Sequence, residues 1–460
     1  MSEIAGLPFW ELTFDADGDP DAAHRDAFLA GLPGSGVTDL IVFSHGWNND
    51  RGIALRLYER FFGVLAGQVP AGRKVGLAGV LWPSQRWSDE PIPDFAAPAG
   101  PGAGRAGAAG GAAAVTDAAG GETVQTPELD PATLADLEEL FPAATGPLRR
   151  IAALLAGPAS KEALEELHAQ MSQFARLTGA AGDDGEDGRE RAGLDPAEPG
   201  MLQDPPTELF ERFAERLQQA GVVFDGDGTG EAGIGDALRG ALHGAKEALR
   251  QLTYWQMKNR AGTVGRSGLG PLLGRVREVA PGVRVHLVGH SFGARLVSYA
   301  VQGVPAGPTP VGSLTLLQGA FSQWVFSPRL PFAADRHGGL AGIGERVGGP
   351  LAVCFSSHDG AVGTFYPLAS MAARDDSAGI GDAASRWGGI GANGAQGAGA
   401  RTEGIRGAEP GVAYPFEDHR ILNIDASDVV RAGGPPSGAH SDIVHPELTR
   451  VVLLAAKITG

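Results

Sequence analysis

The sequence predicts an α/β protein in which helices cover both faces of a mostly parallel sheet. Short apolar runs of strand length alternate along the chain with stretches whose apolar residues recur at helical spacing. Polar or glycine-rich segments follow several of the apolar runs, where parallel strands end and ligands collect. The expected strands cover residues 10–14, 40–43, 75–82, 283–288, 313–317, 351–355 and 420–424.

The N-terminal elements differ in pattern. Residues 10–14 alternate polar and apolar side chains and end at a turn signal, so we expect an edge strand. Residues 40–43 are all apolar, which is typical of a strand buried on both faces. Asp50 then stands where a helix cap is expected, and Pro83 closes the strand at 75–82. The apolar face of the capped helix comprises Ile53, Leu57 and Phe61.

The composition changes between residues 85 and 245. Residues 96–121 are nearly all alanine, glycine and proline, and residues 182–200 are acidic and glycine-rich. Both lack the apolar residues that a core requires, which predicts disorder or loose packing. We interpret 85–245 as a helical cap, or lid, inserted into a core formed by 1–84 and 246–460. The expected cap helices cover 132–141, 147–156, 160–177 and 206–219.

The regular alternation resumes after this insertion. We expect a helix at 245–259 and a shorter helix that contains Leu272, Val276 and Val279. Residues 451–456 belong to the expected last helix. The glycine-rich segment 376–411 is predicted to be a surface loop.

Charge and cysteine content limit the classes of protein that fit. A formal net charge of −17 argues against nucleic acid as a partner and against electrostatic docking on anionic membranes. The lone Cys354 lies in an apolar run, so we expect a small core residue and no internal disulfide. The chain starts without a signal-peptide pattern and contains no apolar run of about 18 residues, so we expect a cytoplasmic protein without a transmembrane segment. Its oligomeric state is not predicted.

The most informative motif is G-x-S-x-G, with Gly289, Ser291 and Gly293 at its fixed positions. With 71 glycines in 460 residues, such a pattern arises by chance roughly 0.5 times per chain, so its flanks carry the interpretation. An apolar strand precedes it and a helix follows, which predicts a sharp turn that projects the serine Oγ over the end of the sheet. Ser291 is therefore the candidate nucleophile. The structural alternative is a glycine turn with a capping serine.

A serine nucleophile needs an imidazole to accept its proton and a carboxylate to orient that imidazole. Asp359 follows the strand at 351–355, and His440 follows the final strand. In this order the chain resembles the α/β-hydrolase superfamily, particularly bacterial esterase-like and lipase-like members with a His-Gly-Trp segment. The resemblance covers roughly residues 1–84 and 246–460. The matching segments are Phe43-Ser44-His45-Gly46-Trp47, Trp82-Pro83-Ser84, Gly289-His290-Ser291-Phe292-Gly293, Ser357-His358-Asp359 and Gly438-Ala439-His440-Ser441-Asp442.

The resemblance implies that Ser291 is the nucleophile, Asp359 the acid and His440 the base. It also implies an oxyanion hole formed by the backbone amides of Trp47 and Phe292. Two preorganised donors stabilise the negative oxygen of a tetrahedral intermediate, and losing one costs about 10²–10³ in rate. The Trp47 indole can also fill the core, since the nominated group is main chain. No cofactor and no metal are implied.

Several residues compete for these roles. Asp425 ends a predicted strand and is the alternative to Asp359. His445 is the alternative to His440, although Pro446 indicates that it begins the last helix. His440, Asp442 and His445 together offer three metal-ligand types, but their spacing is not diagnostic of a metal site.

Other histidines have structural interpretations. We expect His45 and His290 to hold their loops through hydrogen bonds, and His286 to be a satisfied core side chain. His358 either orients Asp359 or is exposed.

The expected reaction is hydrolysis of a small-molecule carboxylic ester through an acyl-serine intermediate. A cap with apolar helix faces suits a lid over an acyl or lipid chain, and the alternative is that its helices pack on one another or bind another protein. The alternative functions are a non-catalytic binding or scaffold protein on the same fold, and a thioesterase or peptidase that uses the same residues. One expected lid face comprises Phe210, Phe213 and Leu217.

Overall fold

The computed structural model describes most of the chain. The predicted loose segment at 96–121 lies outside the described residues, as do 182–199 of the acidic segment and 376–385 of the predicted surface loop. The described residues are 2–84, 87, 124–179, 200–219, 221–224, 234–365, 386–434 and 437–459.

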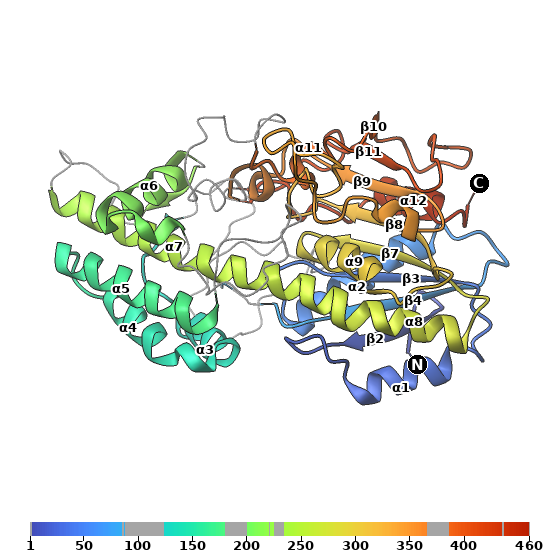
Figure 1. Ribbon diagram of the computed structural model, residues 1–460, viewed down its shortest axis with the longest axis horizontal. Helices are drawn as coiled ribbons and strands as arrows, with labels where there is room; N and C mark the ends of the chain where they lie inside the picture. Colours follow the sequence, from blue (N-terminus) through green and yellow to red (C-terminus); the bar gives the residue numbers. More distant parts are fainter. Residues whose placement is uncertain are drawn as a thin grey trace, which may run out of the picture.

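The described residues form a nine-stranded sheet in the order β1-β2-β4-β3-β7-β8-β9-β11-β10 (Figure 1). Every neighbouring pair is parallel except β1 and β2. The prediction of an α/β protein with a mostly parallel sheet is therefore confirmed. The strands are β1 (Ser2–Ile4), β2 (Leu7–Thr13), β3 (Asp39–Ser44), β4 (Val75–Leu81), β7 (Arg284–His290), β8 (Val311–Leu317), β9 (Leu351–Phe355), β10 (Arg401–Gly404) and β11 (Ile421–Asp425).

The predicted edge strand at 10–14 falls in β2, which lies between β1 and β4. The short β1 pairs with residues 7–9 alone, so residues 10–13 pair within the described sheet only with β4, as an edge strand does. Ala5 and Gly6 both have positive φ, at 50° and 80°. Two such residues form the tight turn that joins antiparallel strands with the natural twist. This turn folds Ser2–Ile4 back onto β2.

Alternate residues of the central strands pack against helices on opposite faces of the sheet. Leu40 and Val42 of β3 belong to one apolar cluster, and Ile41 and Phe43 belong to the other. The first cluster includes residues of α1, α7, α8 and α9, and the second includes residues of α2 and α12. Helices on both faces are thus confirmed. Their bounds are α1 (Ala22–Gly31), α2 (Arg51–Ala66), α7 (Ile234–Thr263), α8 (Gly270–Val279), α9 (Phe292–Gly303) and α12 (Pro446–Ala455).

Several local predictions are confirmed. The Asp50 carboxylate accepts the amide hydrogen of Ile53 at 2.8 Å and caps α2 as expected. The predicted helices near residues 272–279 and 451–456 correspond to α8 and α12. Cys354 is buried, and burial raises the pKa of its thiol to about 12.

The predicted insertion contains helices close to their predicted positions, and Figure 1 shows them to one side of the sheet. The apolar face expected to form a lid surface is buried, because Phe210, Phe213 and Leu217 are all at most 4% exposed. Gly244 of α7 leaves no room for a Cβ beside the Phe210 carbonyl, so α7 closely crosses the helix that carries Phe210. The helices are α3 (Pro131–Leu140), α4 (Thr145–Leu155), α5 (Lys161–Thr178) and α6 (Pro206–Gln219), with a small parallel pair β5 (Val124–Gln125) and β6 (Val223–Phe224).

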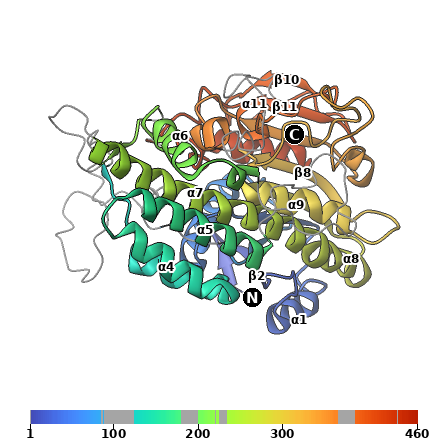
Figure 2. The same cartoon turned by 60° about the vertical axis from the view of Figure 1, so that its left-hand side comes forward.

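Helix α7 is longer than predicted and joins the insertion to the sheet. It spans Ile234–Thr263 rather than 245–259, and it contacts α5 and α6 as well as α9. Figures 1 and 2 show it running from the insertion across the sheet. The predicted boundary at residues 245 and 246 falls inside this helix. The division into core and cap stays a prediction. A π-helical turn, η3 (Val264–Leu269), links α7 to α8.

The prediction of a surface loop at 376–411 is wrong for two described segments, 390–393 and 401–404, whereas 405–411 contains no helix or strand and is mostly exposed. Residues 390–393 form α11 (Ile390–Asn393), and β10 pairs in parallel with β11. The Gly391 amide donates to the Gly319 carbonyl at 2.9 Å, and the Gly391 carbonyl accepts from Ser356 at 2.9 Å. Glycine composition suggested a loop, but here glycine permits a close backbone approach at the sheet end. In the part of the chain that the structure describes, no helix is long and apolar enough to span a bilayer.

Candidate active site

Ser291 occupies a strained turn between β7 and α9. Its φ of 56° and ψ of −123° lie in a region that non-glycine residues rarely adopt. The Ser291 amide donates to the Leu317 carbonyl at 3.1 Å, and the Ser291 carbonyl accepts from Ala320 at 3.2 Å. Gly289 and Gly293 lie against backbone atoms that a Cβ would overlap. The motif therefore forms the sharp turn that its flanks predict.

The structure brings Ser291, His440 and Asp359 together in one hydrogen-bonded chain. His440 Nε2 lies 2.8 Å from Ser291 Oγ, and His440 Nδ1 lies 2.8 Å from Asp359 Oδ2. Asp359 is 2% exposed. With the carboxylate ionised, Nδ1–H donates to Asp359, and Nε2 is left to accept the serine proton. The expected mutual geometry of these three side chains is present.

Backbone contacts fix the two loops that carry Asp359 and His440. The Val362 amide donates to Asp359 Oδ1 at 2.9 Å. The His358 carbonyl accepts from Ala439 at 2.8 Å, which ties the loop after β9 to the loop before α12. A Cβ on Gly438, which has a φ of 57°, would lie 2.7 Å from the Gly360 nitrogen. The His358 side chain is exposed, so this residue connects the two loops through its backbone carbonyl.

The peptide between Gly46 and Trp47 lies against Ser291, the candidate nucleophile. A Cβ on Gly46 would be 2.6 Å from Ser291 Cβ and 3.2 Å from its Oγ. The Gly46 carbonyl accepts from His45 Nδ1 at 2.8 Å and from Asn49 Nδ2 at 3.2 Å. In a trans peptide the N–H points opposite to the C=O. Because His45 and Asn49 hold the Gly46 carbonyl, the Trp47 N–H of the same peptide points away from both side chains.

The second nominated oxyanion donor is the backbone amide of Phe292. Phe292 is the first residue of α9, and a helix offers no internal acceptor to its first amides. The partial positive charge at a helix N-terminus also favours an anionic oxygen there. The Phe292 side chain is fully buried and serves the core.

His45 holds the loop that carries Trp47. Burial lowers the pKa of His45 to about 4, so the ring is neutral at pH 7. The ring stacks on Trp82 with centroids 5.6 Å apart and an interplanar angle of 10°. Its Nε2 accepts from the Trp82 amide at 3.5 Å, and the indole Nε1 of Trp82 donates to the His45 carbonyl at 3.1 Å. The expected loop-holding hydrogen bonds of His45 are present.

His290 holds the loop that carries His440. Its Nε2 donates to the His440 carbonyl at 2.8 Å. Burial, together with the nearby charge of His440, lowers the pKa of His290 to about 3. His290 therefore stays neutral and adds no positive charge beside His440.

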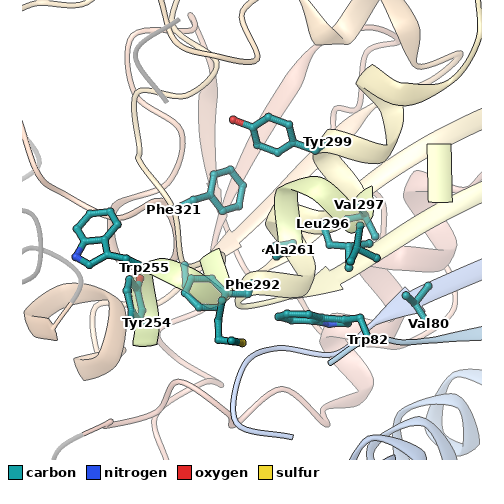
Figure 3. Packing of buried hydrophobic residues seen from close by; sticks show 14 of the residues in the cluster. Val80, Trp82, Tyr254, Trp255, Ala261, Phe292, Leu296, Val297, Tyr299 and Phe321 are labelled. Carbon is teal, nitrogen blue, oxygen red and sulfur yellow. The ribbon is translucent and has the colours of Figure 1, made fainter. Parts of the chain in front are cut away.

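The rings of Trp47 and Phe292, whose amides are the candidate oxyanion donors, pack together with the ring of Tyr254. The Trp47 ring meets Tyr254 of α7 edge-on, with centroids 5.5 Å apart, and lies 6.1 Å from Phe292. Figure 3 shows Tyr254 and Phe292 side by side, and their centroids are 4.7 Å apart. Trp47 is thus a packing residue as well as the source of a main-chain amide, so both interpretations of this residue apply.

The competing residues have other partners. Asp425 Oδ1 accepts from the Ser427 amide at 3.0 Å and also from its hydroxyl. His445 is the N-cap residue of α12, as expected, and its Nε2 lies 2.7 Å from Asp442 Oδ1. Asp442 and His445 therefore face each other, whereas His440 faces Asp359. Among the described residues, no group of three His, Cys, Asp or Glu side chains is arranged to hold a metal ion.

His286 is a satisfied core side chain, as predicted. Its Nδ1 lies 2.9 Å from Ser313 Oγ and its Nε2 3.2 Å from Asp39 Oδ1. Burial lowers its pKa. These contacts hold β7 to its neighbours β3 and β8.

Two residues of the loop that carries Trp47 were missed by sequence reasoning. Asn49 Nδ2 donates to the carbonyls of both Gly46 and Trp47, and Asn48 adopts a φ of 64°. Two consecutive asparagines directly after a buried strand were the available signal, because asparagine caps turns and tolerates positive φ.

None of the family models, curated proteins or solved structures compared with the chain matches it. Membership of the α/β-hydrolase superfamily therefore stays a prediction from the five sequence segments.

Proposed function

We propose that this protein is a serine hydrolase of the α/β-hydrolase type that cleaves carboxylic esters. The observation that carries the proposal is the continuous hydrogen-bonded chain from Asp359 through His440 to Ser291, with 2.8 Å at each step. The strained turn at Ser291 and the two amides beside it support the same reaction.

The reaction has two halves. Ser291 Oγ attacks the ester carbonyl carbon while His440 Nε2 takes the hydroxyl proton, and the carbonyl oxygen becomes an oxyanion. His440 then gives that proton to the departing alcohol oxygen, which leaves an acyl-serine. Water attacks this acyl group in the same way, again with His440 as base, and releases the acid. Asp359 stabilises the imidazolium that forms in each half.

The surroundings suit this chemistry. The amides of Trp47 and Phe292 supply donors for the oxyanion, and their positions are set before the substrate arrives. His45 and His290 are neutral because burial lowers the pKa of each, so the imidazolium of His440 has no cationic histidine beside it.

The described helices of the insertion give no support to an acyl-binding lid. The apolar side of α6 is buried against α7 and its neighbours. Leu177 and Phe332 are the large apolar side chains that stand exposed in the described part of the chain. We therefore propose carboxylic esters as the substrate class without a preference for long acyl chains.

The test compares purified wild type with Ser291→Ala on p-nitrophenyl acetate and butyrate. We expect the variant to lose at least about 10³-fold in kcat, because nucleophile and base act as a unit. Ser298→Ala is the matched control, since Ser298 is a buried serine of α9 that donates only to the Ala294 carbonyl. It should retain wild-type turnover.

Labelling by a fluorophosphonate probe separates the alternatives. Wild type and Ser298→Ala should be labelled, and Ser291→Ala should not. A folded wild type that takes no label indicates a binding or scaffold protein. A labelled wild type that prefers thioesters or peptides over esters indicates the related hydrolases that use the same residues.

A further inference from the structure

Asn48 connects the candidate oxyanion loop to a residue far along the chain. Its Nδ2 donates to the Trp87 carbonyl at 3.3 Å, and its Oδ1 accepts the Trp87 amide hydrogen. One side-chain amide thus pairs with both backbone groups of one residue, as a neighbouring strand would. The φ of 64° at Asn48 is tolerated by few residue types besides glycine, and asparagine is one of them.

Trp87 is in turn anchored to helix α7. Its ring is fully buried, and its Nε1 donates to Thr253 Oγ1 at 3.3 Å. The Arg250 guanidinium lies 4.9 Å from the ring centroid, where a cation is attracted to the aromatic face. Arg250 also forms a buried ion pair with Glu247 at 2.8 Å. Thr253 and Arg250 of α7 therefore hold this indole, and Glu247 holds Arg250.

The same part of α7 also contacts Trp47, the residue that precedes Asn48 in the chain. Tyr254 follows Thr253 directly and packs edge-on against Trp47. Figure 3 shows Tyr254 reaching from α7 to the ring of Phe292. Adjacent residues of one helix thus hold both Trp47 and Trp87, and Asn48 bridges the two.

We propose that Asn48 and Trp87 are positioning residues that fasten the Trp47 amide to α7 and so keep the oxyanion hole in place. This inference rests on the proposed function, because it assigns a purpose to the Trp47 amide. Asn49 and His45 hold the Gly46 carbonyl of this peptide, whereas Asn48 connects the same loop, through Trp87, to the helix that also carries part of the insertion. A displacement of about 1 Å at such a donor is enough to cost about 10²-fold in rate.

The test uses two substitutions that accept the positive φ of Asn48. Asn48→Gly removes both hydrogen bonds without backbone strain, and we expect kcat to fall about 10-fold to 100-fold with little change in KM. Asn48→Asp keeps an acceptor for the Trp87 amide but turns a carboxylate oxygen toward the Trp87 carbonyl, so its loss should be at least as large. The affinity for a trifluoromethyl ketone, which forms an oxyanion on Ser291, should fall in parallel with kcat.

Thr253→Val is the matched variant one step further out. It removes the hydrogen bond to the Trp87 indole but leaves the Asn48 pair, so we expect less than about a 5-fold loss in kcat. Thermal unfolding of each variant checks the fold. A purely structural role predicts lower thermal stability with unchanged kcat and unchanged ketone affinity, and that result overturns the proposal.

The two proposals fail in different ways. An Asn48→Gly protein with wild-type kcat and ketone affinity overturns the positioning role while the esterase assignment stands. A wild type that neither hydrolyses esters nor binds the ketone overturns both.

Discussion

Two histidines shortly before α12 each pair with an aspartate, but only one of them contacts the proposed nucleophile. His440 Nδ1 bonds to the buried Asp359, which leaves Nε2 for Ser291. His445 uses its Nε2 on Asp442, three residues earlier in the chain. The first pair joins two loops at the sheet end, and the second closes a single loop. Residue type alone does not distinguish them, because partner and ring orientation decide what each imidazole can do.

His445 and Asp442 form a charged clamp, meaning an ion pair that closes the loop before α12. Burial acts to raise the pKa of Asp442, but hydrogen bonds from His445 and from the amides of Ala432 and Arg431 lower it below its usual 3.8. The hydrogen bond to Asp442 raises the pKa of His445 above 6.5, against the effect of burial. The pair is therefore fully ionised at mildly acidic pH.

Neutralising each aspartate in turn tests whether the two pairs differ in function. We expect Asp359→Asn to lower kcat by about 10³–10⁴-fold, because the imidazole loses the group that fixes its tautomer. Asp442→Asn should stay within about 5-fold of wild type, because its partner touches no reacting atom. Turnover of p-nitrophenyl butyrate measures both. Equal losses in the two variants would show that the pairs are not functionally distinct.

The second prediction concerns stability. His445→Gln should lower the free energy of unfolding by about 1 kcal/mol, as for a partly exposed ion pair. A raised histidine pKa gives stability that is lost as pH rises through it, and a lowered aspartate pKa gives stability that is lost as pH falls through it. The difference from wild type should therefore be largest between pH 3.8 and 6.5.

Urea unfolding at pH 5.5 and pH 8.5 measures this difference. His358→Gln is the control, because that side chain is exposed, and it should show no such dependence on pH. A His445→Gln deficit that is larger at pH 8.5 than at pH 5.5 contradicts the charged clamp.

The smallest expected effect belongs to Asp425, the alternative acid. Asp425→Asn should leave kcat within about 2-fold of wild type, because this carboxylate bonds to Ser427. Fluorophosphonate labelling and ester turnover measure it. A loss comparable to that of Asp359→Asn would transfer the acid role to Asp425.

The fold could be predicted where the local pattern was strong. Residues 40–43 and 351–355 are short apolar runs, and each forms a strand in the parallel sheet. The prediction fails at two glycines, because it starts a helix after Gly244 and places Gly391 in a surface loop. Gly244 lies inside α7 because α6 crosses there, and Gly391 lies in α11 because backbones meet there. Glycine frequency does not distinguish a loop from a close contact, since both exploit the missing Cβ.

The sequence by itself determined the alternation of strands and helices and the strained serine turn, and it predicted the order of serine, acid and base. These follow from periodicity and from residue types at short spacing, which are local properties. Only the tertiary structure decided that His440 rather than His445 meets Ser291, and that Asn48 meets Trp87. Such contacts join residues far apart in the chain, and they depend on strand order and loop geometry, which no local pattern encodes.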